Sequence, residues 1–332
     1  YLGGDEADQP HSLVTDAAGN LVIMGVTSSD NFPTTTGAYN ETFNLGDYLP
    51  NLDGIYYNNG TDIFVAKLDA NGSSLLGSTY IGGSANDGFS LNPNLKFNYA
   101  DHARGEVVLD ANNTIYITSS TRSADFPAPV GSHQQSLGGN YDGIVSCFSA
   151  DLTTLNWSTY LGGSNGDAGY SIRVSESNNM VAVCGGTNST NIGATSGTIN
   201  TSYSNNVDGY VATFNKSTGA LNALTYLGTG SYDQAYILEI DADNDIYVTG
   251  QTKGAYPVIG SGVYSNPNST QFIHKMDPAL TTTAFSTVFG SGSSAVNISI
   301  TAFLVDKCEN LYVAGWGGWT NNEGFTNGMP IT

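Results

Sequence analysis

The sequence has few basic residues and no long apolar run, and each shortage excludes a class of protein. Only 9 of its 332 residues are Lys or Arg, against 29 Asp and Glu, so the formal net charge is −20. Nucleic acids and anionic membrane surfaces bind proteins through clustered basic side chains, so neither is expected as a partner. No stretch approaches the roughly 18 apolar residues of a membrane-spanning helix, so direct membrane insertion is not expected either.

Cysteine is also scarce. Cys147, Cys184 and Cys308 lie far apart in the sequence, which excludes a disulfide framework and a CxxC metal site, and we expect mostly buried thiols. Charged residues make up only 11% of the chain, whereas Gly, Ser, Thr and Asn are abundant. This composition is typical of a turn-rich β protein rather than of a disordered acidic tail.

A short motif recurs along the chain and indicates a repeat protein. The Tyr-Leu-Gly-Gly that opens the sequence returns at positions 80, 160, 226 and, in degraded form, 288. Between these landmarks each repeat has four short apolar or alternating runs, which is the pattern of short β-strands separated by turns. In the fourth repeat the predicted strands are residues 236–240, 246–249, 272–276 and 284–288.

Four strands per repeat and no helical periodicity predict an all-β fold, a β-propeller of four-stranded antiparallel blades. We expect one propeller segment over residues 1–332, with four full blades and a partial fifth. Because the repeated motif falls where one blade ends and the next begins, we expect ring closure to use chain or a partner outside these residues. The expected blades are 1–79, 80–159, 160–225, 226–287 and, in part, 288–332.

Acidic residues recur at three fixed places in the repeats. Asp side chains bind nearby backbone N–H groups, so we interpret these acids as residues that fix turns. A catalytic carboxylate pair would instead need two unlike environments. The three series are Asp8, Asp87, Asp167 and Asp233 after the motif; Asp16, Asp110, Glu176, Asp241 and Asp306 before the second strand; and Asp62, Asp142 and Asp208 before the third.

One of these turns begins like a calcium-binding loop. Asp241, Asp243 and Asp245 alternate as calcium ligands do, but no Gly follows at the sixth position and Thr252 stands where a bidentate Glu should close the site. We favour a hairpin turn, with Ca²⁺ as the alternative. No other cofactor and no further metal site are expected.

Two insertions enlarge the first two repeats, near residues 41–60 and 89–104. Antiparallel strand order places both on the same face of neighbouring blades. Long loops on a rigid scaffold commonly carry binding function, so we expect the insertions to form a binding surface, with simple surface decoration as the alternative. The candidate binding residues are Tyr48, Tyr56, Tyr57, Lys96, Phe97, Tyr99, His102 and Arg104.

Trp316 and Trp319 form a second candidate binding site, because two exposed indoles could stack on a sugar or a partner. Packing in the core or between blades is the alternative. No catalytic residue is expected. The GxSxG pattern at residues 162–166 is one copy of the turn motif and lacks a strand-to-helix elbow, and the four histidines have no paired spacing.

Several segments together resemble the bacterial β-propeller repeat called SBBP, namely residues 1–4, 16–27, 31–35 and 62–68. Residues 305–318 look like a segment of very large surface proteins of the Bacteroidetes, many of them associated with gliding motility. The resemblance implies secretion by the type IX system and display at the cell surface, in the extracellular space. It supplies no catalytic residues.

The leading functional hypothesis is therefore a noncatalytic extracellular module of a large cell-surface protein, active in adhesion or assembly. Its expected partners are proteins or glycans on cell surfaces, or copies of itself. One alternative is a subunit segment of an extracellular filament. Another is a propeller enzyme that acts on polysaccharide in the central channel, which needs His, Asp or Tyr side chains converging from several blades; the sequence does not reveal such a set.

Overall fold

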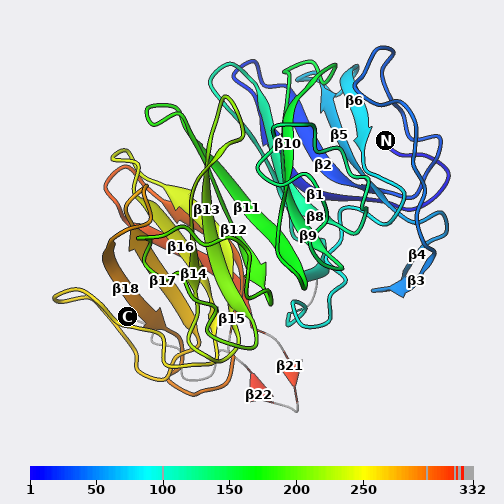
Figure 1. Cartoon of the computed structure of the whole chain (residues 1–332). Helices are drawn as coiled ribbons and strands as arrows, with labels where there is room; N and C mark the ends of the chain where they lie inside the picture. Colours follow the sequence, from blue (N-terminus) through cyan, green and yellow to red (C-terminus); the bar gives the residue numbers. More distant parts are fainter. Residues whose placement is uncertain (99–100, 297, 318, 321–322, 325–332) are drawn as a thin grey trace.

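The chain folds into four four-stranded antiparallel sheets and a fifth, two-stranded sheet, which follow one another in chain order (Figure 1). This computed structural model describes residues 1–98, 101–296, 298–317, 319–320 and 323–324. The predicted all-β propeller, with four full blades and a partial fifth, is confirmed. Within the described residues no helix is long and apolar enough to span a membrane.

The first blade contains β1 and β2, an inserted hairpin of β3 and β4, and then β5 and β6. The second blade contains β7 to β10, and a 3₁₀ turn, η1 (Asp101–Ala103), precedes it. The strand bounds are β1 Asp8–Thr15, β2 Leu21–Thr27, β3 Leu49–Leu52, β4 Ile55–Tyr57, β5 Asp62–Leu68, β6 Leu75–Ile81, β7 Glu106–Leu109, β8 Ile115–Thr121, β9 Asp142–Phe148 and β10 Leu155–Leu161.

The third and fourth blades are regular meanders, and β19 pairs with β20 in the fifth. The strands predicted for the fourth repeat are confirmed, because each lies within one strand of the fourth blade. The bounds are β11 Asp167–Ser175, β12 Met180–Thr187, β13 Asp208–Asn215, β14 Leu221–Leu227, β15 Asp233–Ile240, β16 Ile246–Thr252, β17 Gln271–Met276, β18 Thr283–Phe289, β19 Ser299–Val305, β20 Leu311–Trp316, β21 Trp319–Thr320 and β22 Glu323–Gly324.

The tyrosine of the repeated motif connects the outer strand of each of the first three blades to the loop after the second strand. Tyr80, Tyr160 and Tyr226 are buried. The Tyr160 hydroxyl donates a 2.8 Å hydrogen bond to the carbonyl of Ser123, and its counterparts do the same in their own blades. A buried tyrosine contributes its ring to the core and needs a partner for its hydroxyl, so this contact explains why the motif recurs.

The acids after the motif bind the glycines of the motif. Asp87 Oδ2 accepts a 2.7 Å hydrogen bond from the backbone N–H of Gly83, and Asp167 does the same with Gly163. Burial raises the pKa of each of these carboxyls to about 7. The predicted turn function of this series is confirmed. The glycine before Gly83 is also required, since a Cβ at Gly82 would lie 2.2 Å from an oxygen of Asp62.

The acids before the second strand fix the hairpin between the first two strands. Asp241 Oδ1 accepts the backbone N–H groups of Asp243 and Asp245, at 3.0 and 2.9 Å. The calcium alternative had placed an ion among these residues. In the structure the Lys275 ammonium lies 2.9 Å from Asp241 and 3.3 Å from Asp245, so a lysine occupies the position between two of the three candidate ligands.

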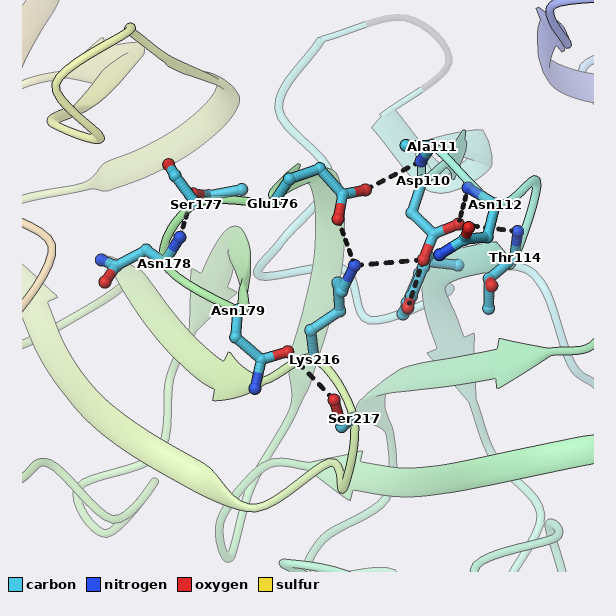
Figure 2. Close-up of polar contacts among 12 residues, drawn as sticks. Asp110, Ala111, Asn112, Thr114, Glu176, Ser177, Asn178, Asn179, Lys216 and Ser217 are labelled. Carbon is cyan, nitrogen blue, oxygen red and sulfur yellow. Dashed lines mark hydrogen bonds and ion pairs between the residues drawn. The ribbon is translucent and has the colours of Figure 1, made fainter.

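An ion-pair cluster connects the second and third blades on the hairpin side (Figure 2). Lys216, just after β13, lies 3.2 Å from Asp110 of the second blade and also pairs with Glu176 of its own blade. Glu176 in turn accepts the backbone N–H of Ala111 at 2.8 Å. Asp110 is almost fully buried, so one ammonium neutralises a buried carboxylate across a blade boundary.

Candidate functional site

The two insertions lie together, as the sequence predicts, but part of them is interior. His102 and Lys96 of the second insertion lie 3.5 and 3.9 Å from the Asp53 carboxylate of the first. Tyr57 and His102 are buried, and the Tyr57 hydroxyl donates a 2.6 Å hydrogen bond to Gln9. These two candidate binding residues therefore connect the insertions to the first blade instead of facing a ligand.

The remaining candidates divide into exposed and interior positions. Tyr48, Tyr56 and Phe97 are exposed, at 53%, 53% and 40% of their surface, and so is Trp316 in β20. Arg104 points into the centre of the molecule. Tyr99 lies outside the described residues, and Trp319 lies in β21.

The second insertion extends over the centre of the propeller. The Asn98 amide donates a 3.0 Å hydrogen bond to the hydroxyl of Tyr236, which belongs to the fourth blade. The Arg104 guanidinium lies 4.0 Å from the centre of the Tyr236 ring and 2.8 Å from Asp101. Burial raises the pKa of Tyr236 well above its usual value, so this hydroxyl stays protonated.

Each of four first strands carries a β-bulge at the same place, and the bulged residues line one central cavity of about 390 Å³. A bulge leaves one residue unpaired in the ladder and redirects its side chain, a device common beside active sites. The bulged residues are His11 in β1, Tyr170 in β11, Tyr236 in β15 and Thr301 in β19.

His11 contributes an imidazole ring to the wall of this cavity. Burial, with a smaller contribution from His102, lowers the pKa of His11 to about 3, so the ring is neutral at physiological pH. In the described part of the chain neither ring nitrogen has a hydrogen-bond partner. Phe89 packs 5.4 Å from it, ring centre to ring centre.

Two carboxylates from different blades meet at one guanidinium beside the cavity. Arg173 of β11 lies 2.6 Å from Glu106 of β7 and 2.9 Å from Glu239 of β15. Burial opposes the charge of Arg173, but the two glutamates outweigh it and raise the pKa of its guanidinium. Because a single planar fork binds both, their nearest oxygens lie within roughly 8 Å of each other.

The two glutamates have unlike surroundings. Glu106 also accepts hydrogen bonds from the Ser171 hydroxyl at 2.6 Å and from the Ile172 N–H at 2.9 Å. Glu239 accepts hydrogen bonds from Arg173 alone within the described residues. Glu106 therefore has two donors besides the guanidinium, whereas Glu239 has none besides it within the described residues.

None of Glu106, Arg173 and Glu239 was predicted from the sequence. One signal was available for the cavity as a whole: His11, Tyr236 and Thr301 each stand five residues before the hairpin acid of their repeat. That position varies among the repeats, whereas most of its neighbours are apolar. A variable polar position within an otherwise regular inner strand predicts a residue that faces the channel.

No family model and no curated protein matches the sequence. Among solved structures, a protein of unknown function from Dyadobacter fermentans is similar, at 10% identity over 93% of this chain and 75% of that one, with a TM-score of 0.45. A mutant of the NanB sialidase from Streptococcus pneumoniae is similar at 10% identity, over 86% of this chain and 49% of that one, with a TM-score of 0.40. The GH43 protein BlXynB from Bacillus licheniformis is similar at 11% identity, over 86% and 42%, with a TM-score of 0.33.

This chain thus spans about half or less of the sialidase and of the GH43 protein. These likenesses concern the fold alone. At the level of the fold they correct two expectations, those of a noncatalytic adhesion or assembly module and of a chain that is not an enzyme, because the similar propellers include a sialidase and GH43 proteins. The sequence had also revealed no converging polar set, and the central cavity contains one.

Proposed function

We propose that the chain is a propeller enzyme that acts on polysaccharide at its central cavity, with Glu106 and Glu239 as the reacting carboxylates. The observation that supports this proposal is the Glu106–Arg173–Glu239 bridge, which holds two carboxylates from different blades at a fixed separation. Glycosidases use two carboxyl groups about 5 to 9.5 Å apart, on either side of the bond that is cleaved. The upper limit of roughly 8 Å, which a single guanidinium sets on the distance between the nearest oxygens of Glu106 and Glu239, is compatible with that separation.

The unlike surroundings of the pair assign a role to each. Glu106, with its additional donors from Ser171 and Ile172, is the carboxylate that acts as an anion, either as nucleophile or as base for water. Glu239, bound by Arg173 alone, is the carboxyl that takes up a proton from solvent once substrate displaces the guanidinium from it, while Arg173 stays on Glu106, and then donates that proton to the leaving oxygen. Division of labour between two carboxyl groups by their environment is the general requirement of this chemistry.

The rest of the cavity suits a sugar. Tyr170 and Tyr236 form part of its wall, where their buried rings pack against the Arg104 guanidinium. The Arg104 guanidinium supplies N–H donors next to them. Few apolar side chains line the cavity, which favours a hydroxyl-rich ligand over a lipid.

The test is a hydrolysis screen of the purified chain on polysaccharides and chromogenic glycosides, followed by two isosteric variants. Glu106→Gln and Glu239→Gln should each lower kcat/KM by at least about 100-fold, the scale of a lost acid or base. Asp243→Asn, the same carboxyl-to-amide change at an exposed position of a hairpin turn, is the matched control and should retain full activity. Wild-type rates in both glutamine variants would contradict the proposal.

From the SBBP resemblance alone we further propose that the chain is exported and displayed outside the cell, where polysaccharide substrates occur. Fractionation of cells that express the full-length gene, with an antibody against this segment, tests export separately from catalysis. Detection of the segment only inside the cell would contradict export and leave the enzymatic proposal standing.

A further inference from the structure

A groove of about 610 Å³ lies beside the second insertion, on the face that carries the long loops. Phe97 of the insertion lines it together with Tyr232 and Lys253 of the fourth blade, which pack against the Phe97 ring. Asn98, the next residue after Phe97, donates to the hydroxyl of Tyr236 in the central cavity. Groove and cavity therefore lie on two sides of one short segment, so a chain-like ligand could occupy both.

The charge in this groove is unusual for the molecule. Apart from Lys253 and Lys307, every lysine and arginine forms an ion pair with an acidic side chain in the described part of the chain. The Lys253 ammonium instead lies over the Phe97 ring, 4.8 Å from its centre. A protein with 29 acids and nine bases has thus kept one ammonium away from its own carboxylates, at an open groove.

The aromatic side chains beside this ammonium form a platform. The ring centres of Phe97 and Tyr232 are 5.0 Å apart, and Phe97 remains 40% exposed although it belongs to a packed insertion. An exposed aromatic face next to a cation is suited to a ligand that is flat and apolar on one side and anionic at its edge. A pyranose ring that carries a carboxylate has this character.

Two asparagines supply hydroxyl-binding groups on the remaining side. Asn205 and Asn206 line the groove, both are exposed, and both have positive φ angles, of 117° and 67°. No hydrogen bond within the described residues occupies their side-chain amides. Consecutive residues held in sparsely populated backbone conformations are a feature of ligand-binding loops. Each free amide can donate to one sugar hydroxyl and accept from another.

We infer that this groove is a binding subsite for a uronic acid unit of an acidic polysaccharide, with Lys253 on the carboxylate, Phe97 under the ring and the two asparagines on the hydroxyls. The inference rests on the proposed function, because it makes the substrate of the central cavity an anionic glycan. It adds a substrate class and a second binding site, in which Lys253 lies 147 residues after the reacting glutamate Glu106 in the sequence. The second insertion connects the two sites, because Phe97 lines the groove and Asn98 binds Tyr236 of the central cavity.

Binding is measured by titration calorimetry with the Glu106→Gln variant, so that no turnover interferes. The probes are tetramers of galacturonate, of mannuronate and of hyaluronate, each compared with its carboxyl-reduced, neutral counterpart. At least one acidic tetramer should bind roughly tenfold more tightly than its reduced form, the scale of one charge-assisted hydrogen bond. Added salt should weaken the binding of the acidic tetramer and leave the affinity for the neutral tetramer unchanged.

Variants assign the binding to the groove. Lys253→Met should remove the preference for the acidic tetramer, and Phe97→Ala should weaken acidic and neutral forms alike by roughly five- to tenfold. Lys307→Met, which removes the other lysine without an acidic partner, is the matched control and should bind as the parent does. Equal affinity for acidic and reduced tetramers in all three series, or unchanged affinity in Lys253→Met, would overturn the inference.

The two proposals can fail separately. If the chain hydrolyses a neutral glycan, loses this activity in Glu106→Gln and shows no preference for uronates, the central active site stands and the uronate subsite in the groove is rejected. The opposite result is also possible to distinguish. If uronate binding depends on Lys253 but the two glutamine variants hydrolyse glycans at wild-type rates, the uronate subsite stands and the assignment of Glu106 and Glu239 as reacting carboxylates is rejected.

Discussion

Replacement of Lys216 by Met should destabilise the chain by breaking the connection between the second and third blades. Met keeps most of the aliphatic length of the lysine side chain, so packing changes little and the ammonium is the group removed. The backbone of Lys216 stays in place, because its N–H donates to the carbonyl of Asn179 and its own carbonyl accepts from Trp157. The perturbation therefore isolates one charge (Figure 2).

The magnitude follows from the surroundings of Asp110, whose side chain is 3% exposed. Removal of one partner of a buried ion pair costs about 3 to 5 kcal/mol. Burial opposes ionisation of Asp110, but the N–H groups of Thr114 and Asn112 and the Lys216 ammonium together hold its pKa below the usual value. The two N–H donors remain in the variant, so we expect the free energy of unfolding to fall by about 2 to 3 kcal/mol. The contact with Glu176, which is 45% exposed, adds less than about 1 kcal/mol.

Urea denaturation followed by circular dichroism measures this change, with Lys307→Met as the control at an exposed lysine. A double variant, Lys216→Met with Asp110→Asn, should recover about 1 kcal/mol or more relative to the sum of the single changes, because the uncompensated carboxylate is gone. If the free energy of unfolding of Lys216→Met stays within about 0.5 kcal/mol of that of the control, the buried Asp110 carboxylate does not need the ammonium for its stabilisation, and the reasoning is refuted.

Three further predictions concern pH, a tyrosine and the central arginine. Burial raises the pKa of Asp62 to about 8 and that of Asp87 to about 7, so between about pH 4 and pH 8 these two carboxyls bind more protons in the folded chain than in the unfolded chain, and their contribution makes the free energy of unfolding fall as pH rises. Urea titrations at pH 5 and pH 8 check this, and greater stability at pH 8 would contradict it. Tyr226→Phe removes the 3.0 Å hydrogen bond to the carbonyl of Ser189 and should cost about 1 to 2 kcal/mol in the same assay, whereas no loss would mean that water replaces the hydroxyl. Arg173→Lys keeps the charge but loses the planar fork, so kcat should fall at least about tenfold on any substrate found in the screen while the unfolding midpoint moves little; equal kcat would refute a positioning role for the fork.

The repeat, the strands and the turn function of the aspartates could be predicted because their causes are local. Asp241 accepts the N–H of a residue two positions later, and Asp87 binds a glycine four positions earlier. Such contacts leave a signature within one repeat, and the repetition makes the signature visible. The strand periodicity is equally local.

The central site could not be predicted in the same way because its residues come from different repeats. Glu106 and Ser171 are 65 residues apart, and Arg173 and Glu239 are 66 apart. Their meeting depends on how neighbouring sheets approach each other, and Glu106 does not stand at the same strand position as Arg173. Glu106, Arg173 and Glu239 each occur only once, so they leave no periodic pattern in the sequence. The comparison of repeats therefore could not identify them.

The bulges of the first strands have a consequence for how such a chain can diversify. A bulged residue has no cross-strand partner to match, so it can be exchanged without a shift in register. Three residue types occupy this position in one molecule: His11, Thr301 and, twice, tyrosine at Tyr170 and Tyr236. Each of these four blades thus offers one independent position at the channel wall, and a few point mutations can change the lining of the cavity while the strands keep their register.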